Sequence, residues 1–186
     1  MSELSHPSLS CRCCSPPPAA HVGRRLFMGF AGALGASALL PGLALSATGK
    51  YDALLLTCID PRFPANTLNY MRGRHLEGKY SQVSLAGASI AVVAQPFKDW
   101  RPAFWDNLAA SIQLHSVPKV IALNHRECGA AAIAYGKEAV AGREMETRTH
   151  RDAFGNFRSQ IAARHPSLIV ETGLMALDGT VETFTS

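Results

Sequence analysis

Two short segments of the sequence place thiol, imidazole and carboxylate side chains close together. They are residues 57–63, Thr-Cys-Ile-Asp-Pro-Arg-Phe, and residues 124–129, Asn-His-Arg-Glu-Cys-Gly. If Cys58, His125 and Cys128 converge, they offer two thiolates and one imidazole, a ligand set that suits zinc. Three protein ligands leave the fourth tetrahedral position open, which is typical of a catalytic zinc site and not of a structural one.

Each segment follows an apolar run that predicts a buried strand. Residues 53–57 precede the first segment, and residues 119–123 precede the second. Ligands of open α/β sheets bind at the carboxyl ends of strands, where the strand order reverses. If the chain reverses between these two strands, the two segments face each other. Further strands are predicted at residues 82–85, 168–170 and 174–177.

Helical spacing separates these runs. Apolar residues recur every three or four positions in two stretches, which predicts amphipathic helices with core-facing stripes. The stripe residues are Phe104, Leu108 and Ile112, and then Phe154, Phe157 and Ile161. Asp99 and Pro102 indicate the start of the first helix, as cap and first-turn proline, and a third helix starts at Gly129.

The pattern of elements predicts one domain over residues 48–186. Strands that alternate with helices favour an α/β fold of three layers, with a central, mostly parallel β-sheet and helices on both faces. Asp178-Gly179 is a turn signal between two strand-like runs, so we expect a C-terminal hairpin at one edge of the sheet.

Together the two segments resemble a known family. Cys-x-Asp-x-Arg after the first strand and His-x-x-Cys-Gly after the third are similar to the signature motifs of the beta-class carbonic anhydrases, over about residues 51–184. The resemblance implies Zn2+ on Cys58, His125 and Cys128. It also implies a homodimer or higher homo-oligomer whose interface borders the site, and carbon dioxide and bicarbonate as the small-molecule substrates.

The resemblance also assigns roles around the zinc ion. Water bound to zinc has its pKa lowered towards about 7, which makes hydroxide available to attack carbon dioxide. Asp60 would orient that hydroxide, and Arg62 would hold the carboxylate ionised by a bidentate pair. In a closed state Asp60 would itself become the fourth ligand. Backbone groups of Ala86, Gly87 and Gly129 are expected on the substrate side.

Two departures from the family pattern stand out. The element after the second strand reads Ala86-Gly87-Ala88-Ser89, where the family commonly has an asparagine after the glycine. Residues 126–127, Arg-Glu, place opposite charges between the second pair of ligands, where smaller polar residues are common.

Other interpretations remain open. Cys58 and Cys128 could form a disulfide, and the same zinc site could hydrolyse carbon disulfide or carbonyl sulfide. A non-catalytic zinc-binding or thiol-redox protein of the same fold is a third alternative. Trp100 and Trp105 are expected in packing or at an interface. The remaining histidines of the domain are expected at the surface or at helix ends: His75, His115, His150 and His165.

The first 47 residues have the character of an export signal. Arg24-Arg25 precedes an uncharged, moderately apolar run at residues 26–40, and residues 44–46, Ala-Leu-Ser, have the small-x-small form of a cleavage site. The run is shorter than the roughly 20 residues of a membrane span. We therefore expect a twin-arginine-type signal over residues 1–47 and a periplasmic protein. An uncleaved anchor or a buried N-terminal helix is the alternative.

The charge balance excludes two classes of partner. From residue 48 onward the chain has 15 basic and 13 acidic side chains, without a run of like charge. Neither a nucleic-acid surface nor a polybasic membrane patch is therefore expected.

Overall fold

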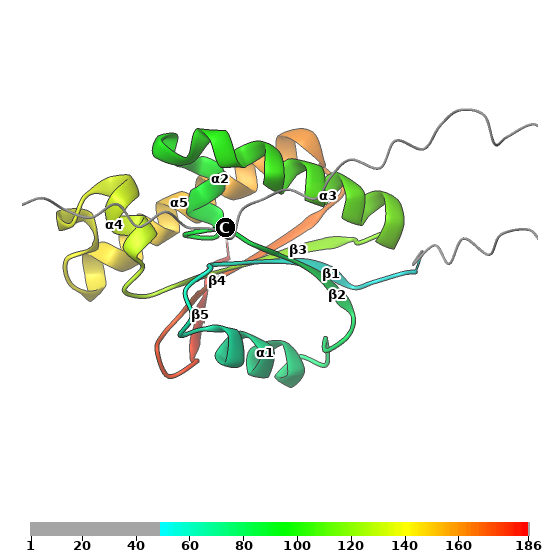
Figure 1. The fold of residues 1–186 in the computed structure, drawn as a ribbon, viewed down its shortest axis with the longest axis horizontal. Coiled ribbons are helices and arrows are strands. Elements are labelled where there is room, and N and C mark those ends of the chain that lie inside the picture. The colour runs from blue at the N-terminus through cyan, green and yellow to red at the C-terminus, as the bar shows by residue number, and fades with distance from the viewer. Residues whose placement is uncertain (1–48, 186) are drawn as a thin grey trace, which may run out of the picture. The chain divides into compact units, whose positions relative to one another are not determined.

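The computed structural model describes residues 49–185, so the predicted export signal lies outside the described residues. This part of the chain forms an α/β fold (Figure 1). Its strands are β1 (Ala53–Thr57), β2 (Tyr80–Ser84), β3 (Lys119–His125), β4 (Ile169–Met175) and β5 (Val181–Thr183). Its helices are α1 (Pro64–Gly73), α2 (Ser89–Val93), α3 (Arg101–His115), α4 (Gly129–Tyr135) and α5 (Arg143–Arg164), with short 3-10 turns at η1 (Gln95–Trp100) and η2 (Glu138–Val140).

The sheet confirms the predicted topology. Its strand order is β2-β1-β3-β4-β5; the first four strands are parallel and β5 is antiparallel to β4. The chain runs outward from β1 to β2 and then returns to the other side of β1 with β3. The switch point therefore lies between β1 and β3, and Thr57 is paired with Leu123 near their carboxyl ends.

Helices cover both faces of the sheet, as predicted. Helix α1 lies on one face, and α2, α3 and α5 lie on the other (Figure 1). Alternate residues of a strand point to opposite faces. Leu55 and Ile121 therefore pack with Met71 of α1, whereas Leu54 and Val120 pack in the core on the other face. Because both faces of β1 and β3 are covered, these strands are apolar almost throughout.

The predicted helical stripes form the core beside the sheet. Phe104 and Leu108 of α3 are fully buried, as are the three stripe residues of α5, and Ile112 is half-buried. Pro102 lies in the first turn of α3 as expected. The cap prediction was wrong: α3 begins at Arg101 after η1, and the cap position, Trp100, makes no side-chain hydrogen bond. Within residues 49–185 no helix is both long and apolar enough to cross a membrane.

The C-terminal hairpin forms, but its strands differ from the prediction. Residues 168–170 and 174–177 were expected as separate runs, and they instead belong mostly to one strand, β4, that continues through residues 171–173. Gly173 lies within this strand, and a side chain there would collide with Val181 of β5. The turn follows the Asp-Gly signal: Asp178 Oδ1 accepts hydrogen bonds from the backbone and hydroxyl of Thr180 at 2.9 and 2.7 Å.

Removing a core aromatic ring tests this layer arrangement. Phe157 is fully buried and its ring lies 5.5 Å from that of Phe104. We expect Phe157→Ala to lower the free energy of unfolding by about 3–5 kcal/mol, measured by urea denaturation, because it leaves a cavity between α5 and α3. Ile133→Ala is the matched control: Ile133 is 70% exposed, so a change of less than about 0.5 kcal/mol is expected.

Candidate metal centre

The elements bring the three predicted ligands together at the switch point. Cys58 directly follows β1, His125 is the last residue of β3, and Cys128 is the residue before α4. One potential ligand atom from each lies within 4.8 Å of the others. His125 and Cys128 are buried and Cys58 is half-buried, so the cluster sits under the surface with one accessible side.

The hydrogen bonding of His125 suits a metal ligand. Its Nδ1 donates to the carbonyl oxygen of Arg126 at 2.8 Å, which leaves the lone pair on Nε2. Nε2 is buried and has no hydrogen-bond partner among the described residues. The ring is stacked on Phe63, with 4.1 Å between centroids. Ligating histidines are commonly oriented in this way: a hydrogen bond from one ring nitrogen, here Nδ1, holds the ring and leaves the other, here Nε2, free for a metal.

The two thiols share one environment. Both cysteines are free, so the alternative disulfide is not formed. A hydrogen bond from the Cys128 thiol lowers the pKa of Cys58 to about 4 against the effect of burial, with help from His125 and the Gly87 amide. The same sulfur contact and burial raise the pKa of Cys128. Cys58 is therefore the more acidic of the two thiols. Metal binding requires both sulfurs as thiolates, so it would release their protons.

Asp60 and Arg62 form the expected pair beside the cluster. Arg62 Nε donates to Asp60 Oδ1 at 3.0 Å, and Nη2 donates to Oδ2 at 2.9 Å. These bonds lower the pKa of Asp60 to about 2. Oδ2 also lies 3.8 Å from His125 Nε2, so the carboxylate faces the ligand cluster. Arg62 also bonds the side chain and carbonyl of Glu127, both at 3.1 Å, and thus joins the two motif segments.

The backbone groups expected at the site lie in two places. The Gly87 amide donates to Cys58 Sγ at 3.1 Å, so it serves the thiolate. Only glycine suits this position, because its φ is +84° and a Cβ would lie 3.1 Å from that of Ala130. Gly129 is the first residue of α4, directly after Cys128. Ala86 lines a separate hollow.

An apolar hollow of about 340 Å³ lies beside the first motif segment. Ile59, which stands between Cys58 and Asp60, is 64% exposed and lines it together with Ala86 and Trp100. Trp100 is stacked on Phe97 with 4.6 Å between centroids. The other tryptophan, Trp105, is half-buried and covered by the guanidinium of Arg164 at 4.0 Å. Trp105 therefore has the expected packing role, whereas Trp100 is 43% exposed and its expected place at an interface stays a prediction.

A buried ion-pair network, which the sequence analysis did not predict, lies behind the ligand cluster. Arg126, 7% exposed, bonds Glu146 of α5 at 3.0 Å and Glu182 of β5 at 2.9 Å. Glu146 also accepts the Glu127 amide at 2.5 Å, so one carboxylate anchors the segment that carries two of the ligands. Arg126 further donates to Thr147 at 2.9 Å. The opposite charges at residues 126–127 thus point in opposite directions, one inward and one to the surface.

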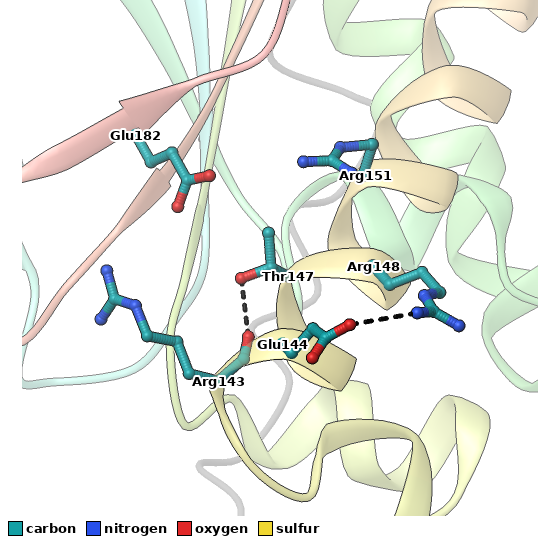
Figure 2. Close-up of a pocket in the computed structure, with 6 residues that line it drawn as sticks. All are labelled: Arg143, Glu144, Thr147, Arg148, Arg151 and Glu182. Atoms are coloured by element: carbon teal, nitrogen blue, oxygen red, sulfur yellow. Dashed lines mark hydrogen bonds and ion pairs between the residues drawn. The ribbon is translucent and has the colours of Figure 1, made fainter.

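The outer side of this network borders a surface hollow of about 420 Å³ (Figure 2). Figure 2 shows Glu182 reaching from β5 towards α5, where Thr147 lies on the first turns of the helix. Arginines surround the hollow: Arg143, Arg148 and Arg151. It is distinct from the ligand cluster, and Thr147 and Glu182 connect the two through the buried Arg126.

The expected position of His150 was wrong. Its side chain is fully buried, and its Nδ1 lies 3.0 Å from Nδ2 of Asn124, the residue before His125. Burial lowers the pKa of His150 to about 3, so the ring is neutral. The remaining histidines lie as expected: His75 is exposed, His115 is the last residue of α3, and His165 follows α5.

Comparison with known proteins identifies relatives by sequence and solved structures with a similar fold. No protein-family model matches the chain. An uncharacterized protein of Rickettsia conorii is 35% identical over 138 residues, which is 74% of each chain. An uncharacterized protein of Rickettsia bellii is 34% identical over 138 residues, which is 74% of this chain and 84% of the relative. The chain belongs to the family of these rickettsial proteins.

Solved structures with a similar fold include beta-carbonic anhydrases. The enzyme from Aspergillus fumigatus has a TM-score of 0.51 at 17% identity, covering 78% of this chain and 80% of that one. The Coccomyxa enzyme, in complex with acetazolamide, has a TM-score of 0.50 at 13% identity, covering 74% and 73%. This chain therefore has the fold of the beta-carbonic anhydrases, and at such low identity the likeness shows the fold alone.

Removing Glu146 tests the anchor behind the ligand cluster. We expect Glu146→Ala to lower the free energy of unfolding by about 3 kcal/mol, measured by urea denaturation, because it leaves the buried Arg126 short of a partner. Glu144→Ala is the matched control from the same helical turn. Its side chain is 92% exposed, so a loss below about 0.5 kcal/mol is expected. Equal losses in the two variants would contradict the anchoring role.

Proposed function

We propose that this protein is a zinc enzyme that interconverts carbon dioxide and bicarbonate. The observation that carries the proposal is the convergence of Cys58, His125 and Cys128, whose ligand atoms lie within 4.8 Å of one another. The fold it has in common with beta-carbonic anhydrases supports the proposal, as do the two sequence motifs on adjacent strand ends.

The donor set fits zinc. Two sulfur atoms and one imidazole nitrogen match its ligand preference, and three protein ligands leave a position for a small molecule. Cys58 and Cys128 would bind as thiolates, and His125 through the unpartnered Nε2. When bound, zinc supplies a nucleophile derived from water at neutral pH and polarises the oxygen of a substrate.

Asp60 is the hydrogen-bond acceptor that orients the reacting group of the proposed site. Arg62 bonds both of its oxygens, which keeps the carboxylate ionised and fixes the direction of Oδ2 towards His125 Nε2. There it can accept a hydrogen bond from a water-derived group and so orient that group's lone pair towards the substrate. Glu127 holds Arg62 from the other motif segment, so both segments set the position of the carboxylate.

Carbon dioxide is small and apolar, and the neighbouring apolar hollow is suited to it. Ile59, Leu85 and Trp100 line this hollow next to the first motif segment. The alternative substrates, carbon disulfide and carbonyl sulfide, are linear and apolar as well. The exposed apolar side chains Ile59 and Trp100 also favour self-association beside the site, and we propose a homodimer or higher homo-oligomer. Export to the periplasm is proposed from the residue pattern of positions 1–47.

Metal content and turnover test the proposal together. We expect about one zinc per chain in protein purified under reducing conditions, carbon dioxide hydration well above background, and loss of both in Cys58→Ser, because it replaces a soft thiolate by a weak hydroxyl ligand. Zinc without hydration would reject carbonic anhydrase activity. Hydrolysis assays with carbonyl sulfide and carbon disulfide on the same preparation would then separate a hydrolase from a non-catalytic zinc protein. Protein without zinc would reject the site itself.

Arg62→Gln tests the role given to Asp60. The folded-state pKa of Asp60, about 2, is below its usual 3.8, so the pair stabilises the fold above about pH 4 and ceases to do so as the pH falls through 2. In Arg62→Gln we expect the Asp60 pKa, followed by carboxyl-carbon NMR, to rise towards 3.8, and hydration to fall about 10- to 100-fold.

The matched control for this variant is Arg72→Gln. Arg72 forms a comparable exposed pair with Glu77 at 2.6 Å, on α1 and away from the ligand cluster. Its loss is expected to leave hydration and the Asp60 pKa unchanged. Unchanged turnover in Arg62→Gln would refute the orienting role of the Asp60–Arg62 pair.

A further inference from the structure

Three buried polar side chains, none of them among the predicted site residues, are hydrogen-bonded in series behind the ligand cluster. Ser89 is the first residue of α2, Asn124 is the second-last residue of β3, and His150 lies on α5. Their exposed fractions are 0%, 1% and 0%. Buried polar groups are costly unless they are hydrogen-bonded, so three of them in contact at this place require an explanation.

The hydrogen bonds among these three side chains have one consistent direction. The backbone amide of Ser89 donates to Asn124 Oδ1 at 3.1 Å, and its hydroxyl donates to the same oxygen at 2.8 Å. The other end of the Asn124 amide, Nδ2, therefore donates to Nδ1 of His150 at 3.0 Å. His150 must then carry its proton on Nε2, which is buried without a partner among residues 49–185.

This series of hydrogen bonds ends at the loop whose Gly87 amide donates to Cys58. Two residues before Ser89, the Gly87 amide donates to Cys58 Sγ. Between them Ala88 has φ 51° and ψ −112°, a backbone conformation that residues with a side chain rarely adopt. Such a conformation persists only where surrounding contacts enforce it. The two bonds from Ser89 to Asn124 are contacts of this kind, since they fix the residue that follows Ala88.

We propose that Ser89, Asn124 and His150 form a positioning relay that holds the Gly87 amide against Cys58 and thereby sets the metal affinity of the centre. The relay rests on the proposed zinc site for its effect on affinity, but its effect on Gly87 is independent of any metal. His150 supplies the lone pair that orients the Asn124 amide. Asn124 fixes Ser89, and Ser89 fixes the loop that carries Gly87.

The relay gives a role to the buried imidazole of His150, whose Nε2 has no partner among the described residues. A leucine at position 150 would remove the orphan Nε2 proton, although it would leave Asn124 Nδ2 without an acceptor. The two changes offset each other, so His150→Leu is expected to melt within a few degrees of the wild type. A loss of metal affinity at unchanged melting temperature is a result that a merely structural role would not produce.

The experiment uses two measurements on the full chain. The first is hydrogen exchange of the Gly87 amide by NMR, in reduced, zinc-free protein. The second is zinc affinity, by competition with a chromophoric chelator. In His150→Leu and in Asn124→Leu we expect Gly87 exchange to become at least about tenfold faster. Zinc affinity is expected to weaken about 10- to 100-fold, as is typical when groups that orient metal ligands are lost.

Two further variants separate the relay from a general effect of mutation. His150→Gln keeps an acceptor for Asn124 and should restore both measurements to near the wild-type values. His115→Leu is the matched control, because His115 is bonded to Ser81 at 2.6 Å near the opposite ends of the strands, and it should change neither.

The possible results test the relay and the proposed zinc enzyme separately. Wild-type exchange and affinity in His150→Leu would overturn the relay. An unprotected Gly87 amide in the wild-type protein would overturn it as well, even if no variant could be folded. If the wild-type protein binds no zinc, the proposed function fails, and Gly87 exchange in the variants alone then supports or overturns the relay.

Discussion

The parallel pairing of β1 with β3 is the constraint on which the site depends. Cys58 and His125 are 67 positions apart in the sequence and become neighbours because Thr57 is paired with Leu123 in the sheet. A shift of one residue in this register would turn every side chain of β3 to the opposite face. The buried apolar residues on both faces of the two strands make such a shift costly. The core therefore acts on the site by fixing the register.

Beyond the strand ends, polar contacts replace the sheet in holding the ligands. On the open side Arg62 joins the two motif segments, and on the buried side Glu146 holds the segment between His125 and Cys128. A buried ion pair such as that of Arg126 with Glu146 seldom adds more stability than an apolar contact would. Its hydrogen bonds are directional, however, and a coordination site needs each ligand held in a defined orientation. These buried charges therefore contribute to the geometry of the motif segments.

The sequence predicted the strand ends and the ligand cluster because both depend on local patterns. Continuous apolar runs identify buried strands, and the chemistry-bearing residues directly follow them. The roles of Arg126 and His150 depend on partners that are 20 or more positions away, which spacing does not reveal. One signal was available. The stripe of Phe154, Phe157 and Ile161, extended backward at helical spacing, passes through His150 and Glu146, and this predicts that both are buried.

The loop at residues 86–89 shows how a departure from a motif can be compensated elsewhere in the fold. Ala88 offers no side-chain amide and adopts a positive φ. An amide is nevertheless present beside this loop, because Asn124 reaches it from β3 and bonds Ser89. Asn124 also precedes His125, so the strand that presents a ligand fixes the loop that donates to another ligand, Cys58. The surroundings of the two ligands are thus joined through Asn124, although their parts come from separate regions of the sequence.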